Sequence, residues 1–424
     1  MSCIADAGPS HSLVNMNVLL ISQHFHPEKT GNAPVATDCA RLISKYGHKV
    51  VVICAMPFYP EWQIREEYQG KLFCTEAFEN ITINRTWVYV PQRASTLKRI
   101  FMELSFSAFS FLMSFTRRFD LLVYVSPPLT AGFVAALVAL VRRKKLYCFV
   151  EDIQPDTAVD LGMLKNKKVI RLMRWIERFM YGRSNKIIVL SEGMARNLKS
   201  KGVATSKLFV IPNGVDIREL TAEGNGSGNF RRTHSLEDKF LVLHSGNIGV
   251  KQNPMIIVEC ARKLAEHPDI FFALVGAGAM KDAVQEKIDQ YGLRNIRVYP
   301  LCDRSELGAL LSSADVLLAS QRKEVVDIVV PSKVITYFAS KRPVLASAHP
   351  ESEVACMLSE NNAGLVVEPD NVDAMSEGIL FLKGDEERAK EMGKRAYELL
   401  SSKFAQEVIS EKYYRPLFGD GGVC

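Results

Sequence analysis

The stretch His244-Ser-Gly-Asn-Ile-Gly-Val-Lys-Gln252 follows an apolar run and leads into a helix-like pattern. Two shorter stretches downstream repeat this arrangement, Gly276-Ala-Gly278 and Val330-Pro-Ser-Lys333, and the second of them leads through a helix into an apolar run at 344–346. Apolar runs of strand length that alternate with helical patterns predict βα units of a parallel sheet. The second half of the chain is therefore predicted to be an α/β domain.

The loops of these units carry groups suited to a nucleotide diphosphate. Ligands of open parallel sheets bind at the carboxyl ends of the strands, where helix N-termini offer unpaired N–H groups to phosphates. Gly246, Gly276 and Gly278 would allow the backbone to approach a ligand closely, and Lys251 and Lys333 would neutralise its charge. We therefore predict a nucleotide-sugar site in this half.

The first half also alternates strands and helices. Strands are expected at 17–22, 49–55, 81–87, 121–125, 145–150, 186–190 and 208–211, with helices such as 36–46 and 169–181 between them. A turn at Pro212-Asn-Gly-Val215 ends this series. The expected architecture is α/β, with two Rossmann-like, doubly wound domains that face each other across a cleft. They span 16–213 and 214–403, and a C-terminal helix at 404–418 is expected to pack back on the first.

Composition and charge agree with a globular enzyme. The 424 residues are 47% hydrophobic and 24% charged, with a net charge of +6, and the length predicts roughly two or three domains. Basic residues cluster in the first half. Such clusters are typical of surfaces for nucleic acid, phosphorylated substrates or anionic membranes, and equally of solvated helix faces.

Cysteines and apolar segments bear on the compartment. The nine cysteines are scattered without a Cys-x-x-Cys pair, as expected of reduced thiols in a cytoplasmic protein. The first fifteen residues do not resemble a secretory signal, and no run reaches the roughly 20 apolar residues of a membrane span. Segments 104–115 and 129–141, with basic flanks, are either buried helices or helices at the inner face of the membrane.

A series of short motifs runs in order from residue 16 to about residue 418. They are Gln23-His-Phe-His-Pro-Glu28 with Gly31, Lys45-Tyr-Gly-His-Lys49, Ser126-Pro-Pro-Leu-Thr130, Glu151-Asp-Ile-Gln-Pro155, Ile211-Pro-Asn-Gly-Val-Asp216, Ser245-Gly-Asn-Ile-Gly249, Val275-Gly-Ala-Gly278, Val330-Pro-Ser-Lys333 and Ala339-Ser-Lys-Arg-Pro343. Together they resemble the GT-B glycosyltransferases of family 4. The likeness is greatest to bacterial exopolysaccharide, colanic acid and O-antigen enzymes that transfer fucose-type or related sugars.

The resemblance implies donor-binding residues in both domains. The loop at Gly31 and Asn32 would approach the donor phosphates from the first domain, and the segment with Gly246, Asn247 and Lys251 would face them from the second. Many relatives have an arginine where this chain has Asn247. Lys251 and Lys333 must then supply the positive charge.

The family's two glutamates, eight positions apart at the donor sugar and the ribose, are missing here. Thr336 and Ile328 occupy their positions, and the nearest acids are Glu324 and Asp327. The resemblance therefore implies that Asp327 contacts sugar hydroxyls. It also implies that Ser332 and Lys333 carry more of the donor site than a carboxylate does.

The acceptor side is expected at Glu151-Asp152, where relatives often have His-Asp. A carboxylate at a strand's carboxyl end can orient or deprotonate an acceptor hydroxyl. Asp152 is the first choice and Glu151 the second; the alternative is that Asp152 caps the following turn. His24 and His26 would line the acceptor cleft or serve a structural role.

The resulting prediction is a retaining glycosyltransferase of hexosyl or deoxyhexosyl type. It would move a sugar from a nucleotide diphosphate to a hydroxyl of a polyprenyl-linked or growing glycan. The chain has no Asp-x-Asp, so we expect neither a divalent metal nor another cofactor. One alternative is an epimerase of the same fold, which needs a second acid/base pair. Another is a basic nucleic-acid-binding protein, although no recognition motif supports a nucleic-acid partner.

Overall fold

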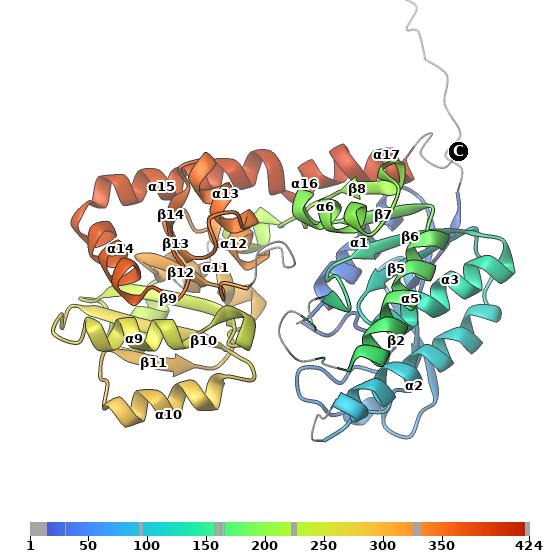
Figure 1. Ribbon diagram of the computed structural model, residues 1–424, viewed down its shortest axis with the longest axis horizontal. Helices are drawn as coiled ribbons and strands as arrows, with labels where there is room; N and C mark the ends of the chain where they lie inside the picture. Colours follow the sequence, from blue (N-terminus) through green and yellow to red (C-terminus); the bar gives the residue numbers. More distant parts are fainter. Residues whose placement is uncertain are drawn as a thin grey trace, which may run out of the picture. The chain divides into compact units, whose positions relative to one another are not determined.

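The computed structural model describes residues 15–29, 31–92, 96–156, 159, 164, 166–221, 227–324 and 332–419. The chain forms two compact units, shown in Figure 1. One consists of Met1–Ile211 together with Ser410–Cys424, and the other of Pro212–Ile409. Each unit has its own sheet.

The first unit is built on an eight-stranded sheet in the order β3-β4-β2-β1-β5-β6-β7-β8. All neighbouring strands are parallel except β3 and β4. The strands are β1 (Asn17–Ile21), β2 (Lys49–Ala55), β3 (Phe73–Phe78), β4 (Ile81–Thr86), β5 (Leu121–Ser126), β6 (Lys145–Val150), β7 (Lys186–Val189) and β8 (Leu208–Val210). Because the chain moves from β1 to one side and returns to β5 on the other, the strand order reverses between β1 and β5. Such a switch point is where open α/β sheets bind ligands.

The helices of the first unit are α1 (Ala33–Lys45), α2 (Thr96–Phe115), α3 (Leu129–Arg142), α5 (Lys167–Arg183) and α6 (Glu192–Ser200). Helix α3 packs against both α2 and α5. The serines inside α2 do not interrupt it, since Ser107 and Ser114 donate to the carbonyls of Glu103 and Ser110 one turn back. In the described part of the chain, no helix is both long enough and apolar enough to span a bilayer.

The last segment of the chain belongs to the first unit. It comprises Ser410–Tyr414 and α17 (Arg415–Phe418). The Tyr46 hydroxyl donates to the Ser410 carbonyl at 2.8 Å, and His48 Nε2 lies 2.6 Å from the Phe418 carbonyl oxygen. These contacts fasten the segment to the end of α1 and the start of β2.

The second unit is built on a six-stranded parallel sheet in the order β11-β10-β9-β12-β13-β14. The strands are β9 (Phe240–Asn247), β10 (Ile270–Ala277), β11 (Ile296–Tyr299), β12 (Val316–Ser320), β13 (Val344–Ser347) and β14 (Gly364–Val367). The strand order reverses between β9 and β12. The carboxyl end of β9 is therefore the expected ligand position in this unit.

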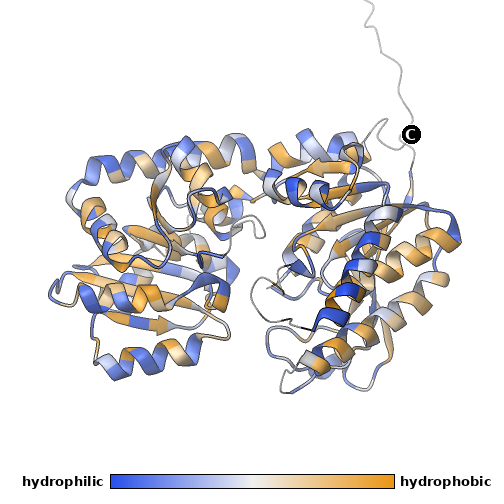
Figure 2. Ribbon diagram, viewed as in Figure 1, coloured by the Kyte–Doolittle hydropathy of each residue, from blue (hydrophilic) through white to orange (hydrophobic). Residues whose placement is uncertain are grey.

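Helices cover both faces of the second sheet. They are α7 (Ile217–Thr221), α8 (Ser227–Thr233), α9 (Met255–Lys263), α10 (Lys281–Tyr291), α11 (Arg304–Ser313), α12 (Ser332–Phe338), α13 (Glu353–Glu360), α14 (Val372–Gly384), α15 (Glu386–Leu399) and α16 (Gln406–Ile409). Two apolar clusters result, one including Leu243 and Phe338, the other Val242 and Ile257. Figure 2 shows apolar strands beneath helices with polar outer faces. The prediction of two Rossmann-like α/β units is confirmed.

Candidate functional site

In the first unit, the turn between β1 and α1 lies at the switch point. Gly31 has φ +66°, a left-handed conformation that favours glycine. The neighbouring Asn32 is buried, and its amide Nδ2 donates to the Pro127 carbonyl at 3.3 Å. This bond ties the turn to the end of β5. The Asn32 Oδ1 atom is buried and has no hydrogen-bond partner among the described residues, so the turn keeps one acceptor unused.

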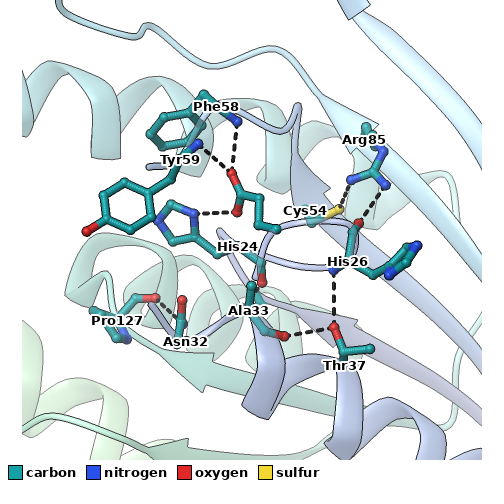
Figure 3. A network of polar contacts seen from close by, with 12 residues as sticks. His24, His26, Asn32, Ala33, Thr37, Cys54, Phe58, Tyr59, Arg85 and Pro127 are labelled. Carbon is teal, nitrogen blue, oxygen red and sulfur yellow. Dashed lines mark hydrogen bonds and ion pairs between the residues drawn. The ribbon is translucent and has the colours of Figure 1, made fainter. Parts of the chain in front are cut away.

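A buried carboxylate organises the same edge. Glu28 Oε1 accepts from the backbone N–H groups of Phe58 and Tyr59 at 2.8 Å each, and Figure 3 shows Phe58 and Tyr59 beside His24 in this network. The other Glu28 oxygen, Oε2, lies 2.7 Å from His24 Nδ1. The His24 ring also lies beside the Phe58 and Tyr59 rings, with centroids 5.1 and 5.5 Å away. One carboxylate thus joins the end of β1 to the loop after β2.

His26 has a different environment. Its ring stacks on Phe78 at 3.9 Å, and its backbone N–H donates to Thr37 while its carbonyl accepts from Arg85. Burial lowers the pKa of His26, and the charge of Arg85 lowers it further. These contacts account for His26 as a structural residue. The two histidines, for which a place in the acceptor cleft and a structural role were the alternatives, therefore differ, and the His24 side chain stays 16% exposed.

The predicted acceptor-side carboxylates follow β6 on the same sheet edge. Glu151 and Asp152 are both partly exposed. The segment that carries them is anchored by Gln154, whose Oε1 accepts from the Leu129 N–H at 3.1 Å. Because β5 lies between β1 and β6, the ends of these two strands are about two strand spacings apart, roughly 9–10 Å.

In the second unit, backbone packing explains two of the predicted glycines. A Cβ at Gly276 would lie 1.8 Å from the Gly246 carbonyl oxygen, and one at Gly278 would lie 2.4 Å from the Ile248 carbonyl oxygen. Both glycines are therefore needed where the ends of β9 and β10 meet, with or without a ligand. Gly246 has φ +127°, and a Cβ there would lie 3.9 Å from Lys333 Cδ.

The buried end of Lys333 is the most unusual feature of this edge. Its Nζ is buried, and no described residue forms a hydrogen bond with it. Burial lowers the pKa of Lys333 to about 7. Burial and the Lys333 charge together hold the pKa of His244 well below its usual value. A cation in this position is costly to bury unless an anion compensates it.

Neighbouring residues hold the backbone around Lys333. The Tyr337 hydroxyl donates to the Ser245 carbonyl and accepts from the Ser245 N–H, both at 2.8 Å. The wholly buried His244 ring lies near the backbone of Asn247 and Leu318 without a regular hydrogen bond. The end of β9 is thus fixed in place above the Lys333 side chain.

Two other predicted donor residues, Asn247 and Lys251, lie at and just after the end of β9. Lys251 lies in a turn at Val250–Gln252, and its carbonyl accepts from the Arg322 N–H at 3.0 Å. Asn247 is exposed, with Nδ2 3.4 Å from Gln252 Oε1. Ser332 begins α12. Asp327 lies outside the described residues.

Sequence reasoning missed Glu28, His244 and Tyr337. Glu28 stands inside a quoted motif, but its partners come from a loop thirty residues away, so no local pattern reveals its role. His244 and Tyr337 look like ordinary members of an apolar strand and an apolar helix. Only the packing of α12 against β9 shows that Tyr337 bonds to the end of β9 and that His244 feels the charge of the buried Lys333.

The chain matches two families. Residues 31–219 match the family described as "Glycosyltransferase Family 4", and residues 228–399 match "Glycosyl transferases group 1". The chain therefore belongs to the family 4 glycosyltransferases of GT-B fold and is a glycosyltransferase.

Particular relatives agree with this family. A colanic acid biosynthesis glycosyl transferase of Escherichia coli K12, WcaI, is 30% identical over 374 residues, which are 86% of this chain and 91% of the relative. The glycosyltransferase WbjE of Pseudomonas aeruginosa is 23% identical over 325 residues, 75% and 80% of the two chains.

Solved structures share the fold. A sucrose-phosphate synthase from Thermosynechococcus elongatus has a TM-score of 0.73 at 16% identity, covering 95% of this chain and 99% of its own. Anabaena HepE, solved in complex with UDP-glucose, has a TM-score of 0.69 at 15% identity with the same coverage.

Proposed function

We propose that the protein transfers a sugar from a nucleotide diphosphate donor to a hydroxyl of a lipid-linked or growing glycan in bacterial polysaccharide synthesis. The observation that carries the proposal is the buried Lys333 ammonium at the carboxyl end of β9, which has no hydrogen-bond partner among the described residues. A donor diphosphate would supply the missing anion. The colanic acid biosynthesis named for WcaI supports the acceptor class, and retention is implied by the family.

On the donor side, Lys251 and Lys333 would stabilise the negative charge that develops on the leaving diphosphate. Gly246 and Asn247 would lie against it through the backbone at the end of β9. Gly31 and Asn32 would contact the donor phosphates from the first unit, and Asp327 and Ser332 the sugar. The proposal requires no metal or other cofactor, since two lysines supply the charge and the chain has no Asp-x-Asp.

On the acceptor side, Asp152, with Glu151 as the second choice, would orient or deprotonate the attacking hydroxyl. Both residues follow a strand of the parallel sheet at its carboxyl end and are partly exposed. The epimerase alternative is not favoured by the comparisons, since both curated relatives quoted above are described as glycosyl transferases.

Thermal unfolding with a panel of UDP-, GDP- and dTDP-sugars tests the proposal. Saturation with a true donor at 100 times its dissociation constant is expected to stabilise the protein by about 2.7 kcal/mol, and an oligonucleotide is expected to do nothing. The stabilising donor is then incubated with a bacterial glycolipid extract. Release of nucleoside diphosphate with labelled glycolipid supports transfer; an altered nucleotide sugar without release identifies an epimerase instead.

We also propose that the first unit touches an anionic membrane at its α2–α3–α5 face. Leu97 and Phe101 on α2 are 74% and 68% exposed, and Trp175 on α5 is 51% exposed. Basic residues accompany them, including Arg99 and Arg171. Apolar side chains beside basic ones are typical of peripheral binding. The protein should sediment with anionic vesicles and be released by salt, and Phe101→Ser should weaken sedimentation; equal binding to neutral vesicles contradicts this proposal.

A further inference from the structure

His24 and Glu28 form a carboxylate–imidazole pair at the ligand edge of the first sheet. A carboxylate only accepts hydrogen bonds, so the 2.7 Å contact makes His24 Nδ1 the donor to Glu28 Oε2. The proton of the neutral ring is therefore on Nδ1, and Nε2 is left with a lone pair. No hydrogen bond from a described residue to Nε2 is present. The pair thus presents one acceptor atom at the open edge of the ring.

The pair is also rigid. Glu28 is held at Oε1 by two backbone N–H groups at 2.8 Å each, and its side chain is 2% exposed. The His24 ring lies beside the Phe58 and Tyr59 rings and keeps 16% of its side chain exposed. His48 shows a different arrangement, because both of its ring nitrogens form hydrogen bonds inside the protein, with Met16 and Phe418. His24 uses only one.

We propose that His24 Nε2 accepts the proton of the acceptor hydroxyl during sugar transfer and that Glu28 is the residue that positions it. This assignment rests on the proposed function. It leaves Asp152, which follows β6 two strands away in the sheet, to orient the acceptor sugar. Among the described residues, the titratable Tyr59 side chain also lies beside the ring.

The step balances without a further reactant. The acceptor oxygen forms a bond to the anomeric carbon, and the bond from that carbon to the diphosphate oxygen breaks. The nucleoside diphosphate leaves with the electron pair, and the hydroxyl proton passes to His24 Nε2. The proton can pass to His24 Nε2 also when the hydroxyl attacks the anomeric carbon on the same face as the leaving group.

The decisive variant is Glu28→Gln. The amide oxygen can still accept from the Phe58 and Tyr59 N–H groups, which leaves the amide NH₂ facing His24 Nδ1. The imidazole must then carry its proton on Nε2, where it can no longer accept one. Turnover of the stabilising nucleotide sugar with glycolipid extract should fall roughly 10²–10⁴-fold, while affinity for the free nucleoside diphosphate should not change. The ¹⁵N spectrum of His24 should show the proton moved from Nδ1 to Nε2.

Two further variants keep the test clear. Glu79→Gln removes an exposed carboxylate that pairs with Arg41 and should leave turnover unchanged. His24→Gln removes the ring and leaves the hydrogen bonds of Glu28 to Phe58 and Tyr59 in place. Its turnover should be lowered as much as that of Glu28→Gln, and it serves as the test if Glu28→Gln folds poorly.

Each negative result has one meaning. Normal turnover in Glu28→Gln with the switched tautomer, or normal turnover in folded His24→Gln, overturns the assignment. A wild-type protein that consumes no nucleotide sugar overturns the proposed function instead.

Discussion

The carboxyl ends of β1 in the first unit and β9 in the second differ in how their charged side chains are compensated. At the end of β1 the charged groups bond to the protein itself, as Glu28 does with two backbone N–H groups and His24. Only neutral amide atoms, Gln23 Nε2 and Asn32 Oδ1, are buried there without partners among the described residues. At the end of β9, by contrast, the charged group itself, the Lys333 ammonium, is buried without a hydrogen-bond partner among the described residues.

The difference indicates two kinds of site. A network whose charges are already compensated holds its geometry before any ligand arrives, as groups that act on a substrate require. A buried cation without a counter-ion is an unfavourable state that an anionic ligand relieves. The first edge is therefore suited to chemistry and the second to holding a diphosphate.

Asp152→Asn, at the carboxyl end of the first unit's sheet, should have the largest effect on turnover. Loss of an acceptor-orienting or proton-accepting carboxylate should lower turnover roughly 10²–10⁴-fold, with donor affinity almost unchanged. Glu151→Gln should be milder. Steady-state turnover and nucleotide titration measure the two quantities, and a fully active Asp152→Asn would remove this residue from the first edge.

Lys333→Ala should break the second edge. Losing a charge-assisted contact to the diphosphate should weaken nucleoside diphosphate binding by about 1.5–3 kcal/mol. Lys251→Ala should weaken it as well, since both lysines are assigned to the diphosphate. Lys390→Ala is the matched control, because Lys390 is an exposed lysine paired with Glu386. If Lys333→Ala binds as tightly as this control, the buried ammonium is no part of the site.

Gly276→Ala tests whether packing shapes the second edge. The added Cβ would meet the Gly246 carbonyl oxygen at 1.8 Å, and the forced backbone shift should cost roughly 1–3 kcal/mol of unfolding free energy. Gly182→Ala, where the Cβ meets nothing within 4 Å, should be neutral or stabilising in its helix. Equal denaturation midpoints for the two variants would contradict the close approach of β9 and β10.

The first unit also buries an ionisable group away from its ligand edge, and its effect should be the smallest. Burial raises the pKa of Glu103 to about 7, against the opposing charge of Arg99. The folded protein then keeps a proton that the unfolded chain loses, so this group lowers the unfolding free energy as pH rises from about 4.5 to 7. The difference in unfolding free energy between Glu103→Gln and wild type should grow in favour of the variant as pH rises through that range. At higher pH the difference should stay constant. Parallel pH–stability curves would contradict the raised pKa.

Much of the fold could be predicted because the parallel strands are continuous apolar runs buried on both faces. The predicted strands 49–55 and 145–150 agree with β2 and β6. Strand β3 was missed; it is an antiparallel edge strand with alternating exposure.

The candidate site could be predicted only in part. Gly-rich turns pointed to the carboxyl ends of β9 and β10, but they gave no means to separate glycines needed for packing, such as Gly276, from those near a ligand. Lys333 was predicted from its place in a loop between a strand and a helix, whereas its burial depends on how α12 packs against β9. The Glu28–His24 pair depends on N–H groups from the loop after β2, a contact that no sequence spacing reveals.

Proton uptake on nucleotide binding tests whether the buried Lys333 side chain meets the donor diphosphate. The Lys333 ammonium has a pKa lowered to about 7 by burial, so at pH 8 most molecules carry a neutral amine. A bound diphosphate should restore the charge, and calorimetric titration of nucleoside diphosphate in buffers of different ionisation enthalpy should show uptake of up to about one proton. Lys333→Met should bind more weakly and take up none. If wild type and Lys333→Met exchange the same number of protons, the buried lysine does not meet the diphosphate.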